Sequence, residues 1–275
     1  MKKYLISLDL DNTILNKKSK ISLIDKIGLK SLLQNGHYII LNSGRPYQGM
    51  IKYIKQLKLY NYPFIASNGG AIYYLNRQEK VVKCISFSMR YQILNDFFNE
   101  IKDYVIYVYF QGVYDTFFYN EEQVPFYMKH PHKNVNFINI NQFLLDQNMI
   151  HVSFAIKANF KEKMEKIIKK FRYKELSFVF WSQKNNIAYY DLQSTATNKG
   201  LAMIYLAKKL KISEDRLFAF GDDLNDIPML QLAKHGFLMP NQKKLQEKYN
   251  LPVINKNSNQ SGVIRFLFKN YRDLF

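Results

Sequence analysis

Cysteine is almost absent from this chain, since Cys84 is the only one among 275 residues. No internal disulfide can form, which fits a reducing compartment, and we expect a soluble cytoplasmic protein in which Cys84 is a small apolar core residue. Long apolar runs are also absent, because no stretch approaches the roughly 20 apolar residues that span a bilayer. Residues 1–4 lead into a short apolar run and then into acidic residues. We therefore expect no signal peptide and no membrane partner.

Acidic residues are scarce relative to basic ones, 22 against 40, which gives a formal net charge of +18. A charge of this sign attracts nucleic acid, membrane surfaces or anionic metabolites. The basic residues, however, include short lysine pairs spread along the chain, and no zinc-finger or basic-zipper motif accompanies them. We therefore expect no nucleic-acid partner. A non-catalytic nucleic-acid-binding protein is the alternative that the charge leaves open.

Short apolar runs alternate with amphipathic stretches in two parts of the chain. In the first part we expect strands at 4–8, 37–41 and 64–66 and helices at 19–34 and 47–58. In the second part we expect strands at 217–220, 236–238 and 252–254 and helices at 199–210, 225–233, 242–249 and 261–270. Strands that alternate with helices pair in parallel through right-handed crossovers. The pattern predicts an α/β fold with a doubly wound parallel sheet.

The residues between these two parts have a different sequence pattern, in which the expected strands are longer and richer in aromatic residues. We expect strands at 104–110, 114–119, 151–157 and 178–181 and helices at 89–102 and 160–172. Alternating strands of this kind indicate a half-exposed α+β sheet. The predicted organisation is therefore one α/β core, residues 1–84 and 189–275, interrupted by an inserted α+β domain at 85–188.

Polar and acidic side chains follow the predicted core strands, where open α/β sheets bind their ligands. The first strand is followed by Asp9 and Asp11, the second by Ser43, Gly44 and Arg45, and a later one by Asp222, Asp223, Asn225 and Asp226, while Lys199 begins a core helix. Each segment alone has an ordinary explanation as a turn, a loop or a solvated lysine. Their joint occurrence in this order, each at the same edge of the sheet, is what indicates a site.

Four carboxylates that converge at one edge need a compensating positive charge, because they cannot all remain ionised together. Oxygen ligands without histidine or cysteine favour a hard cation, and Mg²⁺ suits few carboxylates with water and a phosphate oxygen. Lys199 adds a second, fixed positive charge. The hydroxyl of Ser43 and the amide of Gly44 can donate to phosphate oxygens. The residues therefore predict a magnesium site that binds a phosphorylated molecule.

These segments resemble a known family, the Cof-type phosphatases of the haloacid dehalogenase superfamily. The family's Asp-x-Asp-x-Thr, Thr/Ser-Gly-Arg, Lys and Gly-Asp-x-x-Asn-Asp motifs match Asp9, Asp11 and Thr13, then residues 43–45, Lys199, and residues 221–226. Residues 67–70 resemble the family's Asn-Gly turn that leads toward an inserted domain. Two positions depart from the pattern, because Asn12 replaces a usual glycine and Ser261 stands where an aspartate is common. Asn tolerates a left-handed backbone, so Asn12 is compatible with the motif.

The resemblance implies a role for each matching residue. Asp9 is the expected nucleophile that forms an aspartyl phosphate, Asp11 the general acid and base, and Lys199 a charge-balancing catalytic residue. The expected phosphate-binding residues are Ser43, Gly44, Arg45, Lys199 and Asn225, and the expected Mg²⁺ ligands are Asp9, Asp11, Asp222 and Asp226, with Asp11 ligating through its backbone carbonyl. Asp226 holds either a metal-bound water or Lys199. The inserted domain is implied to be a cap that selects the substrate.

The substrate class stays open at this point. Sugar phosphates, pyridoxal phosphate and flavin mononucleotide all fit the resemblance, and residues 85–188 carry no signature that selects one small phosphorylated metabolite. A phosphomutase, which returns the phosphate to a sugar instead of releasing it to water, is the main enzymatic alternative.

Overall fold

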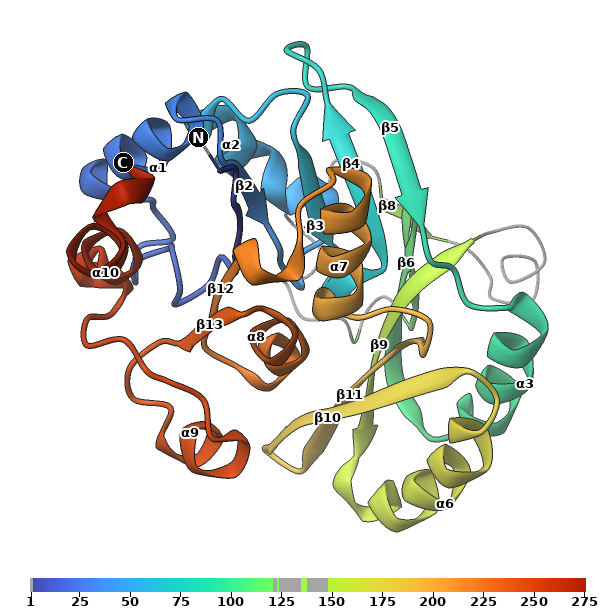
Figure 1. The fold of residues 1–275 in the computed structure, drawn as a ribbon. Helices are drawn as coiled ribbons and strands as arrows, with labels where there is room; N and C mark the ends of the chain where they lie inside the picture. Colours follow the sequence, from blue (N-terminus) through green and yellow to red (C-terminus); the bar gives the residue numbers. More distant parts are fainter. Residues whose placement is uncertain (1, 121–122, 124–134, 138–147) are drawn as a thin grey trace. The chain divides into compact units, whose positions relative to one another are not determined.

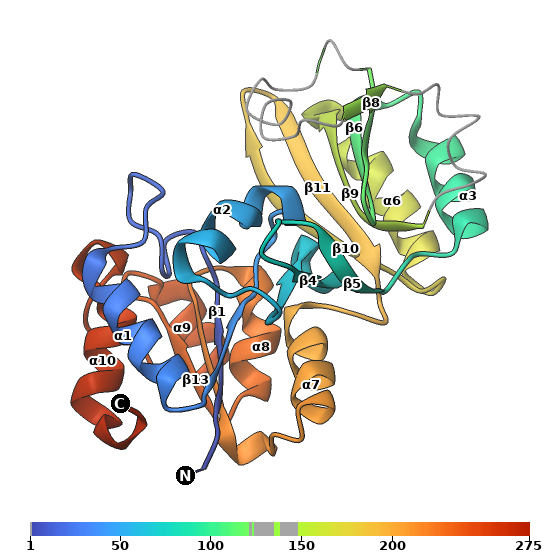
Figure 2. The same ribbon diagram turned by 90° about the horizontal axis from the view of Figure 1, so that it is seen from above.

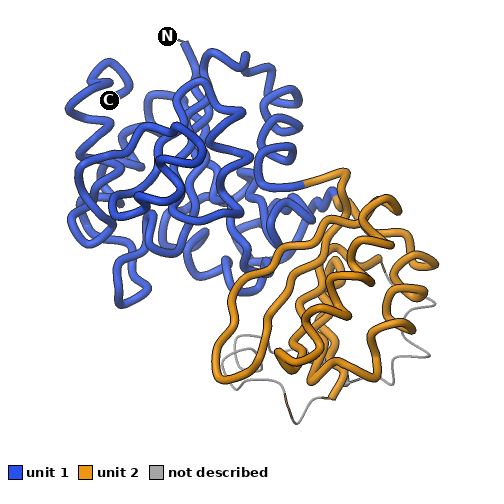
Figure 3. The backbone as a smooth tube through the Cα atoms, turned by 90° about the horizontal axis from the view of Figure 1, so that it is seen from below, with its two compact units in different colours: residues 1–85, 198–275 blue, residues 86–197 orange. Residues whose placement is uncertain are grey.

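The computed structural model describes residues 2–120, 123, 135–137 and 148–275 (Figures 1 and 2). The chain divides into two compact units, Met1–Ile85 with Asn198–Phe275 and Ser86–Thr197 (Figure 3). The first boundary lies one residue from the expected position. The second lies later than 188, because that residue falls inside β11 (Ile187–Ser194), which pairs with β10 (Leu176–Lys184) and belongs to the inserted unit.

The first unit is built on a four-stranded parallel sheet in the order β13 (His235–Leu238), β12 (Leu217–Gly221), β1 (Leu5–Leu8) and β2 (Tyr38–Leu41). Every residue of β1 and β12 is buried, as expected for apolar runs inside an α/β core. Isolated parallel bridges extend the pairing at both sides, from Asn42 to Ile65 and from Leu238 to Val253. The strand expected at 252–254 is therefore reduced to a single bridge.

Helices cover both faces of this sheet. Figures 1 and 2 show α1 (Leu23–Gln34) and α10 (Gly262–Asn270) on one face and α7 (Lys199–Lys209) and α8 (Ile227–Leu232) on the other. The remaining helices of the unit are α2 (Tyr47–Leu57) and α9 (Lys243–Tyr249). This arrangement confirms the doubly wound α/β fold. The helix expected from residue 19 begins later because the Ser22 hydroxyl caps it by accepting from the backbone N–H of Asp25.

A second sheet of the first unit was not expected from the sequence. It is formed by β3 (Pro63–Ala66), β4 (Ala71–Leu75) and β5 (Val81–Ser86), with β3 and β4 antiparallel. The turn between β3 and β4 contains a short 3-10 segment, η1 (Ser67–Gly69).

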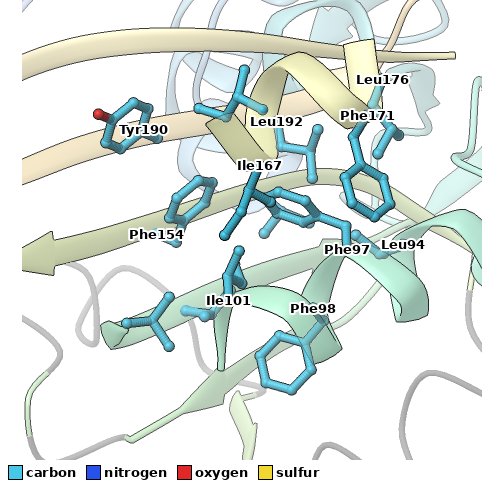
Figure 4. Close-up of a cluster of buried hydrophobic side chains, with 14 of the residues drawn as sticks. Leu94, Phe97, Phe98, Ile101, Phe154, Ile167, Phe171, Leu176, Tyr190 and Leu192 are labelled. Carbon is cyan, nitrogen blue, oxygen red and sulfur yellow. The ribbon is translucent and has the colours of Figure 1, made fainter. Parts of the chain in front are cut away.

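In the described residues of the second unit, two helices pack on a six-stranded sheet. The strand order is β10, β11, β9 (Met149–Lys157), β6 (Val105–Gly112), β7 (Thr116–Tyr119) and β8 (Val135–Phe137), in which only β7 and β8 among the described pairs are parallel. The helices α3 (Tyr91–Ile101) and α6 (Lys161–Arg172) pack apolar side chains onto the sheet (Figure 4). Phe97 of α3, for example, contacts the rings of Phe154 and Phe171.

None of the helices in the described part of the chain combines the length and the apolar character that a membrane crossing requires.

Candidate active site

The four segments singled out in the sequence lie in the first unit, at the carboxyl ends of its parallel strands. Asp9 follows β1, and its backbone N–H donates to Phe220 O of β12 at 3.0 Å. Asn42 follows β2, and its N–H donates to Leu8 O at 2.8 Å. Because β1 pairs in parallel with both β2 and β12, the residues that follow these three strands are neighbours.

Lys199 links two of the predicted carboxylates. Its Nζ lies 2.7 Å from Asp9 Oδ1 and 2.6 Å from Asp226 Oδ1, and its side chain is only 1% exposed. Burial lowers the pKa of Lys199, but the charges of Asp226 and Asp9 offset this effect and raise the pKa above its usual value. Lys199 is therefore a buried ammonium group held between two carboxylates.

The backbone that carries Lys199 is held by two asparagines. Lys199 is the first residue of α7, and Asn198 caps this helix by accepting from Leu201 N at 2.9 Å. Asn42 is fully buried and donates through Nδ2 to Lys199 O at 3.0 Å and to Ser7 Oγ at 3.2 Å. The position of Asn42 directly after a predicted strand was the available signal for this contact, but its partner lies far away in the sequence.

Asp9, Asp222 and Asp226 form a cluster in which one ligand atom from each lies within 4.8 Å of the others. Burial raises the pKa of Asp9 to about 8, against the opposing effect of Lys199, and the neighbouring Asp226 raises it further. Burial also raises the pKa of Asp222 to about 7, again with a contribution from Asp226. The cluster thus holds more negative charge than Lys199 balances. Its oxygen donors fit a hard divalent cation.

Asp226 differs from the other two because protein donors already engage both of its carboxylate oxygens. Oδ1 accepts from Lys199, and Oδ2 accepts from the backbone N–H groups of Asp222 and Asp223 at 2.9 and 3.0 Å. A side chain at Gly221 would place its Cβ 2.4 Å from the Asp226 Cβ and Cγ, so glycine is required there. This geometry favours the expected role of holding Lys199 and disfavours the expected role of Asp226 as a direct Mg²⁺ ligand.

Asp11 lies apart from the three-carboxylate cluster. Its carboxylate accepts two hydrogen bonds from Arg45, from Nε to Oδ2 and from Nη2 to Oδ1, both 2.7 Å long. The side chains of Arg45 and Asp11 are 30% and 50% exposed, so the pair is partly solvated. Arg45 was expected to bind phosphate, and the sequence did not indicate that it also pairs with Asp11.

The remaining predicted residues line the same edge. Ser43 is buried, and its hydroxyl accepts from the Arg45 N–H at 3.2 Å. Asn225 lies in the short 3-10 segment η5 (Leu224–Asp226), and its Nδ2 donates to Asn68 Oδ1. Asn12 has the left-handed backbone that its sequence position suggested, with φ of 57°. Its side chain also hydrogen-bonds Asp222, which opposes the rise in the pKa of that carboxyl group.

The fold is that of a known class of hydrolases. The family model of the haloacid dehalogenase-like hydrolases matches residues 6–267, and the chain belongs to this family. The match confirms the expected superfamily and the expected class of enzyme, a hydrolase.

Several relatives of the chain carry the name of a phosphatase or putative phosphatase. The chain is 24% identical over 255 residues to the 5-amino-6-(5-phospho-D-ribitylamino)uracil phosphatase YitU of Bacillus subtilis, covering 87% of each chain. It is 25% identical over 276 residues to the putative phosphatase MG125 of Mycoplasma genitalium, covering 95% of this chain and 93% of the relative. These names support the expectation of a phosphatase.

Solved structures of the superfamily share the fold. BT1666 from Bacteroides thetaiotaomicron, described among phosphatases of the superfamily, superposes with a TM-score of 0.78 at 21% identity, covering 100% of this chain and 96% of that one. The subclass IIB sugar phosphatase BT4131 superposes with a TM-score of 0.76 at 16% identity, covering all of both chains. Such likeness extends over both the core and the inserted residues.

Proposed function

We propose that the chain is a Mg²⁺-dependent phosphatase that hydrolyses a small phosphorylated metabolite through an aspartyl phosphate on Asp9. The observation that carries this proposal is the buried cluster of Asp9, Asp222 and Asp226 with Lys199, at the carboxyl ends of the parallel strands. Such a cluster is costly without a bound cation, because burial disfavours each charged carboxylate. A site for a divalent cation and a phosphoryl group explains why the charges are gathered there.

In the first half of the reaction, an oxygen of Asp9 attacks phosphorus. Lys199 contacts Asp9 Oδ1, so it orients the carboxylate and offsets negative charge near the transferring group. The bond from Asp9 to phosphorus forms as the bond to the leaving oxygen breaks. Asp11 donates a proton to that oxygen, which leaves as an alcohol.

In the second half, water attacks the phosphorus of the aspartyl phosphate. Asp11, now deprotonated, takes a proton from this water. The bond between Asp9 and phosphorus breaks, which restores the Asp9 carboxylate and releases orthophosphate. In this half Arg45 donates to both oxygens of the Asp11 carboxylate and keeps this base in one orientation.

The donor set suits Mg²⁺, with Asp9 and Asp222 as the carboxylate ligands and the Asp11 backbone carbonyl as a third oxygen. When bound, the cation supplies positive charge that stabilises the oxygens of the transferring phosphoryl group. The hydroxyl of Ser43, the amide of Gly44, Asn225 and Arg45 provide donors for the phosphate on this side of the sheet.

The metabolite class is a sugar phosphate or a related small phosphomonoester. This proposal is supported by the names of the relatives, since YitU is named for a phosphoribityl compound and BT4131 for sugar phosphatase activity. We further propose that the inserted unit, residues 86–197, selects among such substrates as a cap. A Mg²⁺ assay of a panel of phosphorylated metabolites tests the proposed substrate class.

The decisive experiment compares Asp9→Asn with wild type, using p-nitrophenyl phosphate and Mg²⁺. Asparagine has nearly the same size but cannot act as the nucleophile, so turnover should disappear while the fold remains. Asp215→Asn is the matched control, because Asp215 precedes β12 in an exposed turn and should leave turnover unchanged. Retained turnover in Asp9→Asn would contradict the proposal. Product analysis with a hexose phosphate distinguishes release of orthophosphate from transfer to a second position of the sugar.

A further inference from the structure

The turn between β3 and β4 has an unusual backbone. Ser67, Asn68 and Gly69 follow one another with φ of 51°, 55° and 97°, all in the left-handed region. Serine rarely adopts this conformation, which is strained for most residues other than glycine and persists only where the surroundings enforce it. The strained backbone therefore indicates that contacts with neighbouring segments hold this turn in place.

Two neighbouring segments of the proposed site hold the turn. The N–H of Ser67 donates to Arg45 O at 2.9 Å, and the N–H of Asn68 donates to Ser43 O at 3.1 Å. On its other side the turn packs against the start of α7, since a Cβ at Gly69 would lie 2.4 Å from the carbonyl carbon and oxygen of Asn198. The turn is therefore fixed to the phosphate-binding loop at residues 43–45 and to the helix that begins with Lys199.

The side chain of Asn68 reaches a third segment of the site. Asn68 is 7% exposed, and its Oδ1 accepts a hydrogen bond of 2.8 Å from Asn225 Nδ2. The carboxamide passes close to Gly44, where a Cβ would lie 2.9 Å from Asn68 Oδ1. Glycine at position 44 therefore leaves room for this side chain, in addition to any approach of a phosphate.

We propose that Asn68 is a positioning residue that fixes the carboxamide of Asn225 for the phosphoryl group, an inference that rests on the proposed phosphatase function. The hydrogen bond uses one N–H of the Asn225 amide and thereby sets the direction of the second N–H. Without Asn68, the Asn225 side chain would have to be ordered when phosphate binds, and the entropy lost in that step would weaken binding.

The test removes the carboxamide while it keeps the left-handed backbone. Asn68→Gly does so, because glycine adopts positive φ without strain. We expect the inhibition constant for orthophosphate and the KM for p-nitrophenyl phosphate to rise about 5- to 10-fold, as for the loss of one ordered hydrogen bond. Asn61→Gly is the matched control, because Asn61 also has positive φ, 64°, but is exposed and precedes the opposite end of β3. It should leave both constants unchanged.

A double variant shows whether Asn68 acts through Asn225. If it does, Asn68→Gly combined with Asn225→Ala should bind orthophosphate no more weakly than Asn225→Ala alone. Losses that multiply, or an Asn68→Gly variant that binds orthophosphate as wild type does, would overturn the inference. Calorimetric titration with orthophosphate gives the same comparison without turnover. Absence of turnover in wild type would instead count against the phosphatase proposal, and the calorimetric comparison would still decide the role of Asn68.

Discussion

Arg45 donates two hydrogen bonds, each 2.7 Å long, to the two carboxylate oxygens of Asp11. The planar guanidinium donates to both oxygens at once and so fixes the orientation of the Asp11 carboxylate. A point charge such as an ammonium group would not fix this orientation. The pair is partly exposed, so its contribution to stability should be only about 0–1 kcal/mol. Its importance therefore lies in the placement of the proposed acid and base, and this can be separated from stability by experiment.

The first prediction concerns this pair. Arg45→Lys keeps the positive charge but cannot bind both oxygens, so we expect kcat to fall about 10-fold while the melting temperature changes little. Steady-state kinetics with p-nitrophenyl phosphate and thermal denaturation measure the two effects. Arg265→Lys, a substitution on α10 in the same unit, is the control. An unchanged kcat in Arg45→Lys would show that orientation of Asp11 does not depend on Arg45.

Lys199 is predicted to be necessary for stability as well as activity. Lys199→Met leaves the buried carboxylates without the ammonium group that contacts Asp9 and Asp226, which should cost about 3–5 kcal/mol of unfolding free energy near neutral pH. Burial raises the pKa of Asp9 from 3.8 to about 8, so the folded state binds this proton more tightly than the unfolded chain. Lys199 opposes this rise, so in Lys199→Met the pKa of Asp9 should be higher still, and the loss should grow as the pH rises above about 8.

Urea denaturation of Lys199→Met at about pH 6 and about pH 9 measures the difference. Lys208→Met, near the end of the same helix and exposed, is the matched control. A destabilisation of Lys199→Met that is equal at both pH values would contradict the electrostatic explanation.

Mg²⁺ should stabilise the protein more at high pH than at low pH. Burial raises the pKa of Asp222 from 3.8 to about 7, and a proton on this carboxyl group competes with the cation. The increase in melting temperature on adding Mg²⁺ should thus be larger at about pH 8 than at about pH 6, and EDTA should reverse it. Removing Mg²⁺ with EDTA should also abolish turnover.

Asp222→Asn provides the complementary test of this cation site. The variant should lose the stabilisation by Mg²⁺, because one of its proposed ligands is neutral. Without Mg²⁺ at about pH 8 it should be more stable than wild type by roughly 1 kcal/mol, since one repelling buried charge is gone. Mg²⁺ that stabilises Asp222→Asn as much as wild type would show that the cation binds elsewhere.

Another buried aspartate, Asp25, lies away from the cluster of Asp9, Asp222 and Asp226 and predicts a separate pH effect. Asp25 is 1% exposed and lies at the start of α1, where the Ser22 hydroxyl donates to its Oδ2 at 2.8 Å and lies 2.6 Å from the Ser261 hydroxyl. Burial raises the pKa of Asp25 from 3.8 to about 6, although the hydrogen bonds from Ser22 and Ser261 oppose this. The folded protein thus prefers Asp25 protonated, and stability falls as the pH rises from about 4 to 6.

Asp25→Asn removes this charge and keeps an acceptor for Ser22. It should be more stable than wild type by about 1–3 kcal/mol above pH 6, and the difference should disappear below about pH 4. Denaturant titrations across this range measure it, with the exposed Asp103→Asn as the control. A variant that is less stable than wild type at neutral pH would show that the ionised carboxylate contributes favourably, for example through its electrostatic interaction with Arg265.

The core strands were predictable because each is a short apolar run that ends at a polar residue. The expected strands at 4–8, 37–41 and 217–220 agree within one residue at each end with β1, β2 and β12. In contrast, β11 was missed because Asp191 and Gln193 interrupt its apolar pattern. Asp191 is tolerated in the sheet because it accepts from Ser153 Oγ and lies 2.9 Å from His151 Nε2, partners about 40 positions away. Contacts over such separations do not appear in a local pattern.

The distinction between local patterns and contacts over long sequence separations applies to the candidate site as well. Residues that follow parallel strands must meet at one edge, so the gathering of Asp9, Ser43 and Asp222 could be anticipated from topology. The pairing of individual side chains could not, because it depends on rotamers and distances of a few ångströms. For this reason the engagement of both Asp226 oxygens, the Arg45–Asp11 pair and the role inferred for Asn68 emerged only from the structure.

The order of strands in the first sheet has a consequence for how the protein is made. β1 is central, with Leu5 opposite both Tyr38 of β2 and Leu217 of β12. During translation one edge of β1 must remain without its final neighbour until more than two hundred residues have left the ribosome. The inserted unit, whose described strands form one sheet of their own, has by then emerged completely and can close that sheet first. Nascent chains halted when the inserted unit, but not β12, has left the ribosome should therefore contain a protease-resistant inserted unit beside an open, aggregation-prone half of the core.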